Sequence, residues 1–120
     1  MIPIPIYVAL GGALGAVLRY FVNLIVGGTT ATLAVNVVGS FVMGCAFIYL
    51  MSDKSLGWWM PFILTGILGG FTTFSAFSLE VMRMVQADNL SGAALYVLAS
   101  VILSVLACGV GIWIMKGLIS

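Results

Sequence analysis

The stretch GGFTTFSAFSLE, residues 69–80, interrupts one of the most apolar parts of the chain. Gly69 and Gly70 are followed by Thr72 and Thr73, and this combination makes a poor helix centre. A break at this place frees carbonyl groups from the upstream half of the helix and N–H groups from the downstream half. Hydrocarbon cannot satisfy them, so the break predicts that protein, water or an ion does.

The composition is that of an integral membrane protein. The chain has 120 residues, of which 63% are hydrophobic and 6% are charged. Apolar runs of about 18 residues or more, long enough to cross a bilayer, separate the charged positions. The sequence has no basic patch, so nucleic acid is not an expected partner. It has no histidine and few acidic residues, so the chain is not expected to be an enzyme. The charged residues are Arg19, Asp53, Lys54, Glu80, Arg83, Asp88 and Lys116.

The whole chain, residues 1–120, is predicted to be a single all-α membrane domain with four spans. Gly27 and Gly28 end the first span, Asp53 and Lys54 follow the second, and short polar loops leave no room for a soluble domain. The third span is expected to be broken at its middle. The predicted spans are residues 5–26, 32–51, 58–85 and 91–115.

The charges do not fix an orientation in the membrane. With four spans, Lys54 and Lys116 lie on one side, and Arg83 and Arg19 lie nearest to the other. Lysine and arginine normally mark the cytoplasmic side, and here the count is two against two. We therefore predict dual topology, in which the chain inserts both ways and two copies pair antiparallel as a homodimer. The alternative is that another feature sets one orientation.

Polar side chains recur every fourth residue on the second and fourth spans, which places each set on one helix face. The sets are Thr32, Asn36 and Ser40, and Ser100, Ser104 and Cys108. A serine can bond back to its own helix, but a single backbone carbonyl cannot satisfy an amide. Asn36 therefore needs a partner helix or a ligand, and both remain open.

Three charged residues lie within the predicted membrane spans, where a charge is costly. Arg19 lies well inside the first span, where a charge faces a cavity or a partner, or reaches toward the interface. Glu80 and Arg83 are three residues apart, and this spacing predicts a salt bridge at the wall of a vestibule.

The residues after the break suit an anion. Phe74 and Phe77 are neighbours on one helix face, and so are Ser75 and Ser78. Aromatic rings have a positive edge that can face an anion, and hydroxyl groups can donate hydrogen bonds to one.

Along its whole length the chain resembles the Fluc (CrcB) family of fluoride channels. The resemblance rests on GGALGAVLRY at residues 11–20, LAVNVVGS at 33–40 and GGFTTFSAFS at 69–78. Two positions depart from the family pattern. Ala76 stands where the family commonly has threonine, and Cys108 stands where it often has a hydroxyl residue.

The resemblance implies an antiparallel dual-topology homodimer in a bacterial inner membrane, with two pores that export fluoride passively and lower its cytoplasmic concentration. It also implies a structural sodium ion at the dimer centre, held by main-chain carbonyls of Gly69 and Thr72. In this interpretation the partners are fluoride, a second copy of the chain and the lipid bilayer. The residues expected along the fluoride pathway are Phe74, Phe77, Asn36, Ser75, Ser78, Ser104 and Arg19.

Two other functions are compatible with a small four-span protein. A small multidrug-type dual-topology exporter needs a carboxylate deep in the first span, where this chain has only Arg19. A non-transporting membrane assembly subunit could use its polar residues as contacts between helices, but it would not explain the broken third span.

Overall fold

The computed structural model describes residues 2–120, and this part of the chain folds into helices without a strand. Four helical segments are long and apolar enough to cross a membrane, so the protein is a multi-pass membrane protein. They overlap the predicted spans, although the second and third begin four residues earlier and the fourth ends four residues later than predicted. The segments are Ile4–Ile25, Gly28–Met51, Lys54–Gln86 and Leu90–Ile119.

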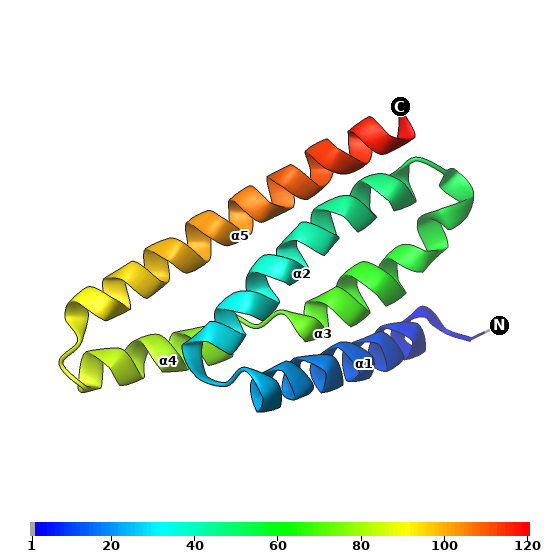
Figure 1. The fold of residues 1–120 in the computed structure, drawn as a ribbon. Helices are drawn as coiled ribbons and strands as arrows, with labels where there is room; N and C mark the ends of the chain where they lie inside the picture. Colours follow the sequence, from blue (N-terminus) through cyan, green and yellow to red (C-terminus); the bar gives the residue numbers. More distant parts are fainter. Residues whose placement is uncertain (1) are drawn as a thin grey trace.

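The first two spans are uninterrupted helices joined by a tight turn (Figure 1). Helix α1, Ile4–Ile25, begins directly after Pro3 and has a proline in its first turn, where no N–H donor is needed. Helix α2, Gly28–Met51, follows after two residues, Val26 and Gly27. Gly27 and Gly28 have φ angles of 76° and 64°, which glycine adopts without steric cost.

The third span consists of four pieces. A 3₁₀ turn, η1 (Lys54–Trp59), follows Asp53, whose carboxylate accepts a hydrogen bond from the Ser55 N–H at 2.9 Å. This bond and one from the Ser55 hydroxyl hold the pKa of Asp53 below its ordinary value. The π-helix η2 (Pro61–Leu68), the short helix α3 (Gly69–Phe71) and helix α4 (Ser75–Gln86) come next.

The third span is interrupted between α3 and α4, as the sequence predicts, but the break lies just beyond the glycine pair. Gly69 and Gly70 are helical, whereas Thr72 is extended, with φ −82° and ψ 158°. At Gly70 the missing side chain serves helix packing and not the break. A Cβ atom at Gly70 would lie 2.5 Å from the carbonyl oxygen of Gly12, so Gly70 lets α3 approach the backbone of α1.

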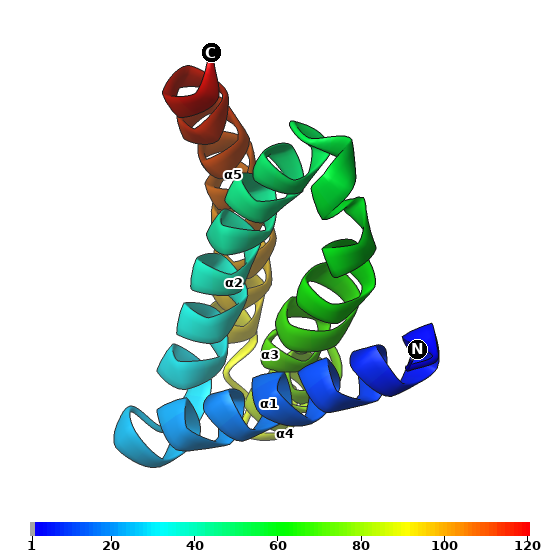
Figure 2. The same cartoon turned by 90° about the vertical axis from the view of Figure 1, so that its right-hand side faces the viewer.

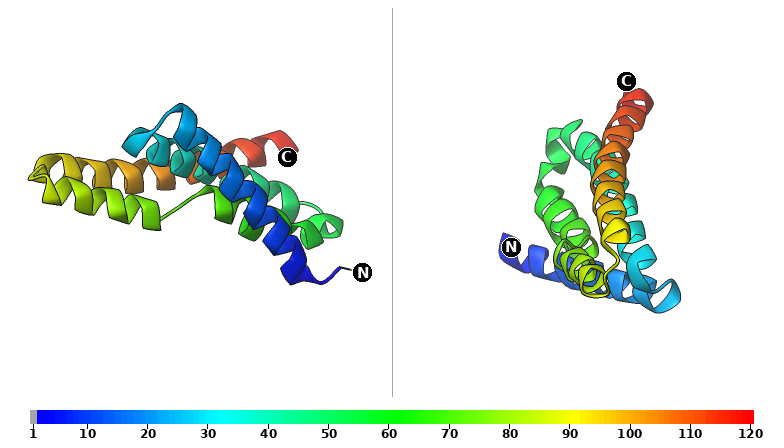
Figure 3. Two further views of the ribbon diagram at one scale, coloured as in Figure 1. Left: turned by 90° about the horizontal axis from the view of Figure 1, so that it is seen from below. Right: turned by 90° about the vertical axis from the view of Figure 1, so that its left-hand side faces the viewer.

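Helix α5, Leu90–Ile119, runs uninterrupted to the end of the chain. Asp88 occupies the left-handed region (φ 59°) in the turn before it, and the Asn89 side chain caps the helix by accepting from the Gly92 N–H at 3.0 Å. This turn lets α4 and α5 lie against each other (Figure 3).

The spans form two helix pairs (Figure 2), and Figure 1 shows that the two members of each pair run in the same direction. In one pair, α1 packs on η2 and α3 where Gly11 meets Gly66. In the other, α2 packs on α5 where Gly44 and Gly111 face the opposite backbone. After the break the chain leaves the first pair, because α4 contacts α5 and α2.

The buried apolar core is small. Most large apolar side chains are exposed on the protomer and face lipid or another protein surface. The buried hydrophobic residues are Ala31, Val35, Leu50, Leu68, Phe77, Ala93 and Tyr96.

Candidate functional site

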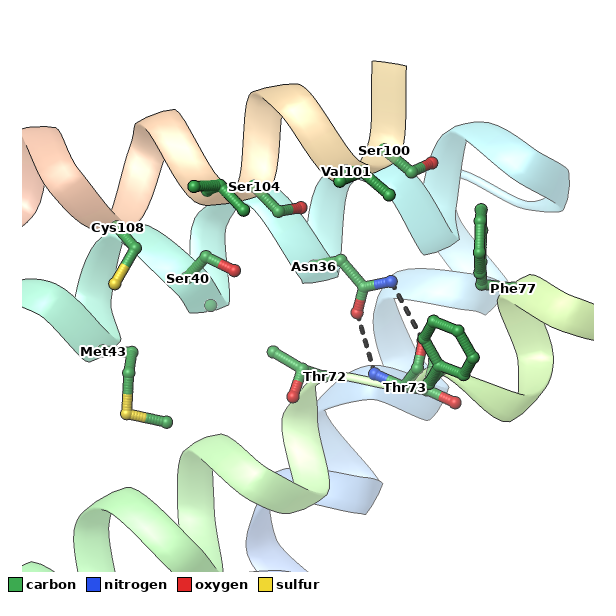
Figure 4. Close-up of a pocket in the computed structure, with 13 residues that line it drawn as sticks. Asn36, Ser40, Met43, Thr72, Thr73, Phe77, Ser100, Val101, Ser104 and Cys108 are labelled. Atoms are coloured by element: carbon green, nitrogen blue, oxygen red, sulfur yellow. Dashed lines mark hydrogen bonds between the residues drawn. The ribbon is translucent and has the colours of Figure 1, made fainter. Parts of the chain in front are cut away.

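A groove of about 370 Å³ lies between α2, α5 and the break in the third span (Figure 4). It is lined by apolar side chains and by hydroxyl, amide and thiol groups, and none of the lining residues is charged. The lining residues are Asn36, Gly39, Ser40, Met43, Thr72, Thr73, Phe74, Phe77, Ser100, Val101, Ser104, Val105 and Cys108.

The side-chain amide of Asn36 bridges α2 to the break. Its Nδ2 donates to the carbonyl oxygen of Thr73 at 2.9 Å, and its Oδ1 accepts from the Thr73 N–H at 2.8 Å. The pair satisfies two backbone groups that the interruption frees. An amide nitrogen carries two N–H donors, so a second donor of Asn36 remains at the wall of the groove.

Several carbonyl groups at the break have lost their helical donors. The Thr73 N–H, which would bond Gly69 in a continuous helix, bonds Asn36, and the Ala76 N–H bonds the Thr73 hydroxyl at 3.2 Å. Within residues 2–120, no hydrogen bond reaches the carbonyl oxygens of Gly69, Phe71 or Thr72. These three oxygens are therefore free to accept from water or to coordinate a cation.

Arg19 lies beside the break rather than in the groove. Its Nε donates to the carbonyl oxygen of Gly70 at 3.1 Å, so α1 satisfies another acceptor at the end of α3. The backbone carbonyl of Arg19 in turn accepts from the Asn23 side chain at 3.2 Å.

A row of hydroxyl groups follows the groove. Ser40 on α2 and Ser100 and Ser104 on α5 all line it. Ser100 is only 6% exposed, and its Oγ has no hydrogen-bond partner among the described residues. A buried hydroxyl without a partner is costly, so the groove is suited to a guest that can bond it.

The two aromatic rings at the start of α4 are in very different environments. Phe74 and Phe77 have ring centroids 5.5 Å apart at 54°. Phe77 is 6% exposed and packs on Tyr96, whereas Phe74 is 77% exposed. Phe74 therefore presents its ring to lipid or to a neighbouring molecule.

The groove gathers only part of the predicted pathway. Asn36, Phe74, Phe77 and Ser104 line it together. Arg19, Ser75 and Ser78 lie outside the groove of the protomer: the Ser78 hydroxyl bonds the Phe74 carbonyl at 2.9 Å, and the Ser75 hydroxyl lies 3.4 Å from that of Thr73.

The predicted salt bridge between Glu80 and Arg83 is wrong for the described residues. The Glu80 carboxylate accepts instead from the Thr32 hydroxyl and, at 3.1 Å, from the Tyr96 hydroxyl. Arg83 is exposed. The two hydroxyls are the partners because the Glu80 side chain reaches α2 and α5, whereas Arg83 remains exposed.

Tyr96 is the residue of this cluster that the sequence does not identify. The helical spacing points to Thr32 and the charge points to Glu80, but neither predicts the hydrogen bond between them. Tyr96 lies 16 residues from Glu80, and no local pattern marks it.

Side chains do not offer a metal centre of the usual kind. No group of three or more His, Cys, Asp or Glu residues able to hold a metal occurs in the part of the chain that the structure describes. The cysteines Cys45 and Cys108 are free thiols. A hard cation would have to use main-chain oxygens, and the Gly69 and Thr72 carbonyls fit that requirement.

Comparison with known proteins gives one consistent family. A family model described as CrcB-like protein, Camphor Resistance (CrcB), matches residues 6–112. A relative from Roseobacter denitrificans, named fluoride-specific ion channel FluC, is 43% identical over 93% of this chain and 94% of its own. Relatives of the same name from Paracoccus denitrificans and Hahella chejuensis are 44% and 45% identical, each over 92% of this chain and 93% of its own.

Proposed function

The chain belongs to the CrcB family, and from this premise we propose that it is a fluoride-selective ion channel and not an enzyme. The observation that carries the proposal is the uncharged groove, in which hydroxyl and amide donors face the aromatic rings at the break. Relatives that share more than two fifths of its residues carry the name fluoride-specific ion channel.

The groove chemistry suits a small, strongly hydrated anion. Fluoride gives up its water only if the pore replaces that water with donors. The free N–H of Asn36 and the hydroxyls of Ser100 and Ser104 can supply these donors, and the ring edges of Phe74 and Phe77 add positive potential. No lysine or arginine lines the groove, so the anion is not trapped by a fixed charge.

Transport is passive. Hydrogen fluoride is a weak acid that crosses membranes as a neutral molecule and dissociates at the higher pH inside a cell. The trapped anion then leaves down its own gradient. The channel accordingly belongs in the inner membrane of a bacterium, where it lowers cytoplasmic fluoride.

The channel is an antiparallel homodimer assembled from both orientations. The balance of two basic residues on each side supports dual topology. The groove of one protomer is open, and Phe74 at its edge is 77% exposed, so a second protomer has a surface to cover. Ser75, Ser78 and Arg19, which lie outside the groove of one chain, would join the pathway at that interface.

A structural sodium ion at the centre of the dimer would bind carbonyl oxygens that the break in the third span leaves free. The carbonyl oxygens of Gly69 and Thr72, two of the three at the break that accept no hydrogen bond, support this site, and two chains would supply four of them. Carbonyl dipoles without a carboxylate suit a monovalent ion better than calcium or magnesium, which usually draw acidic side chains. The ion would hold the two broken spans together.

Fluoride efflux from liposomes tests the proposal. Vesicles loaded with potassium fluoride and containing the purified protein should release fluoride when a potassium ionophore is added, while vesicles loaded with chloride should not release chloride. A proton-coupled exporter would need an imposed pH gradient, and an assembly subunit would release nothing. Loss of fluoride at the rate of protein-free vesicles would disprove the channel.

A further inference from the structure

Gly39 on α2 lies directly against the residues at which the third span breaks. A Cβ atom at Gly39 would overlap the methyl group of Thr72 and would lie 3.2 Å from the ring carbon Cδ2 of Phe71. Gly39 is buried and lines the groove. We propose that Gly39 is a positioning residue: the space left by its missing side chain receives the Thr72 methyl group and keeps the free Thr72 carbonyl oxygen in place.

The Thr72 side chain is held in one orientation by its own helix. Its Oγ1 donates to the carbonyl oxygen of Leu68 at 3.0 Å, and the Thr72 N–H donates to the same oxygen at 3.1 Å. Because Oγ1 and the methyl group branch from one carbon, a rotation that moved the methyl group would break the Oγ1 bond. The methyl group points toward α2 (Figure 4). A larger residue in place of Gly39 would therefore displace the backbone of the break.

Asn36 holds the other side of Thr72. The Thr73 N–H donates to the Oδ1 of Asn36 at 2.8 Å. The Thr72 carbonyl and the Thr73 N–H belong to one planar trans peptide group, in which they point in opposite directions. The Thr72 carbonyl oxygen therefore points away from the Asn36 side chain. Asn36 and Gly39 are three residues apart on one face of α2, so one helix face holds both the Thr72 side chain and the peptide group that follows it.

This arrangement matters for the ion because the Thr72 carbonyl has no other support. Thr72 is extended, with φ −82° and ψ 158°, and its carbonyl oxygen accepts no hydrogen bond within residues 2–120. A displaced backbone would change the distance from this oxygen to a bound cation. Gly39 thus acts on the ion through Thr72 and does not touch it. This role rests on the proposed sodium site, whereas the contact between Gly39 and Thr72 does not.

Gly44, on the same helix, provides a contrast. A Cβ atom at Gly44 would meet the backbone of Cys108, so this glycine lets α2 and α5 pack closely. The atoms that a Cβ at Gly39 would meet all belong to side chains, those of Thr72 and Phe71. Removing the Thr72 methyl group can therefore relieve a substitution at Gly39, but it cannot relieve one at Gly44.

The first test compares variants by thermal unfolding of the detergent-purified protein. Gly39→Ala should lower the melting temperature by about 5 °C or more, because an added methyl group in a closely packed site is costly. The same change in the Thr72→Ser background should lower it much less, since serine keeps the hydroxyl and lacks the methyl group. Thr72→Ser should not relieve Gly44→Ala. Gly109→Ala should cause no loss, because a Cβ atom at Gly109 would have open space around it.

Equal losses from Gly39→Ala in the two backgrounds would overturn the proposal. If Gly39→Ala does not yield folded protein, recovery of the double variant supports the proposal. Failure of the double variant under conditions in which Thr72→Ser alone purifies would overturn it.

The second test separates positioning from packing. Sodium is titrated into protein that has been held in a large organic cation until its sodium is lost, and the melting temperature is recorded at each concentration. A ligand of the folded state raises the melting temperature once its concentration exceeds its dissociation constant. Gly39→Ala should raise that concentration by about tenfold, and the double variant should respond to sodium as Thr72→Ser alone does.

A substitution that only loosened the fold would lower the melting temperature at every sodium concentration and leave the concentration of half response unchanged. That result for Gly39→Ala would overturn the positioning role. If the wild type does not respond to sodium, the sodium site itself fails and the role of Gly39 toward the ion fails with it. The comparison in the Thr72→Ser background still decides whether Gly39 positions Thr72.

Discussion

Asn36 and Thr73 are joined by two hydrogen bonds that run in opposite directions, 2.9 Å from the side-chain amide to the carbonyl and 2.8 Å from the backbone N–H to the amide oxygen. A side chain on α2 thus bonds the N–H and the carbonyl group of Thr73, which neighbouring turns would bond in a continuous helix. Because only an amide both donates and accepts in this way, the position requires asparagine for the fold as well as for the proposed fluoride path.

Replacing Asn36 by aspartate should therefore damage both. A carboxylate keeps the acceptor but loses the donor, and it faces the Thr73 carbonyl with a negative charge. We expect a loss of about 1–3 kcal/mol in stability from the unpaired carbonyl, and fluoride efflux near the protein-free rate. Thermal unfolding in detergent and liposome efflux measure the two effects. Asn23→Asp is the control, because the Asn23 amide is exposed and bonds only its own helix; equal damage from both changes would contradict this role.

Gly69 and Gly70 should differ sharply when each is changed to alanine. A Cβ atom at Gly70 would lie 2.5 Å from the Gly12 carbonyl oxygen, whereas one at Gly69 has only the Leu64 carbonyl near it, at 3.6 Å. Gly70→Ala should push α3 away from α1 and lower the melting temperature. Gly69→Ala should be neutral or stabilise by up to about 1 kcal/mol, because alanine is the better helix former. The reverse order of melting temperatures would mean that the break, and not the packing, requires the glycines.

Phe77→Ile and Phe74→Ile should separate packing from transport. Phe77 is buried against Tyr96, and loss of the ring pair should cost about 0.5–1.5 kcal/mol in addition to the lost burial. Phe74 is 77% exposed, so its replacement removes little buried area and should cost only the ring pair with Phe77, about 0.5–1.5 kcal/mol. Both variants should reduce fluoride efflux, since isoleucine has no ring edge. Wild-type efflux from both would place the anion path elsewhere.

The carboxylate of Glu80 should be sensitive to the loss of either partner. Tyr96→Phe removes one hydroxyl and leaves a partly buried carboxylate oxygen without this partner, at about 1–3 kcal/mol, whereas Glu80→Gln replaces charge-assisted hydrogen bonds by neutral ones and should cost about 1 kcal/mol. The double variant should cost less than the sum, because the two residues share one hydrogen bond. Arg83→Gln serves as the comparison and should stay within about 0.5 kcal/mol, since Arg83 is exposed. Strictly additive losses would contradict the hydrogen bond as the basis of the effect.

Dual topology predicts a specific complementation. Three lysines added around Ser55, in the loop after α2, should fix one orientation, and three added around Asn89 should fix the other. Each biased version alone should fail to confer fluoride efflux on cells that lack other exporters, and expression of both together should restore it. Full activity from one biased version alone would contradict an antiparallel dimer.

The number of spans follows from the sequence because apolar length decides it, whereas the ends of three spans lie four residues from their predicted positions. The exact place of the break does not follow from the sequence either, because Gly70 is kept helical by its contact with Gly12, far away in the chain. The same limit applies to Glu80. Its local spacing favours Arg83, but its partners come from α2 and α5 and can be identified only once the helices are packed.

The proposed site, too, could be predicted only in part from the sequence. Regular spacing on α2 and α5 identifies Asn36 and Ser104, and both line the groove. That Phe77 is enclosed by its own chain while Phe74 is exposed depends on how α4 rotates after the break, which three residues of irregular backbone control.

The interleaved pairing of the spans has a consequence for biosynthesis. The first span packs on the third and the second on the fourth, so the two spans that leave the ribosome first have few contacts with each other. Neither span makes its close glycine contacts until later parts of the chain have been translated. We therefore expect the hairpin of the first two spans to stay loosely packed in the membrane while the rest of the chain is synthesised. During this time a chain with balanced charge can still insert in either orientation, until the packing of the later spans fixes it.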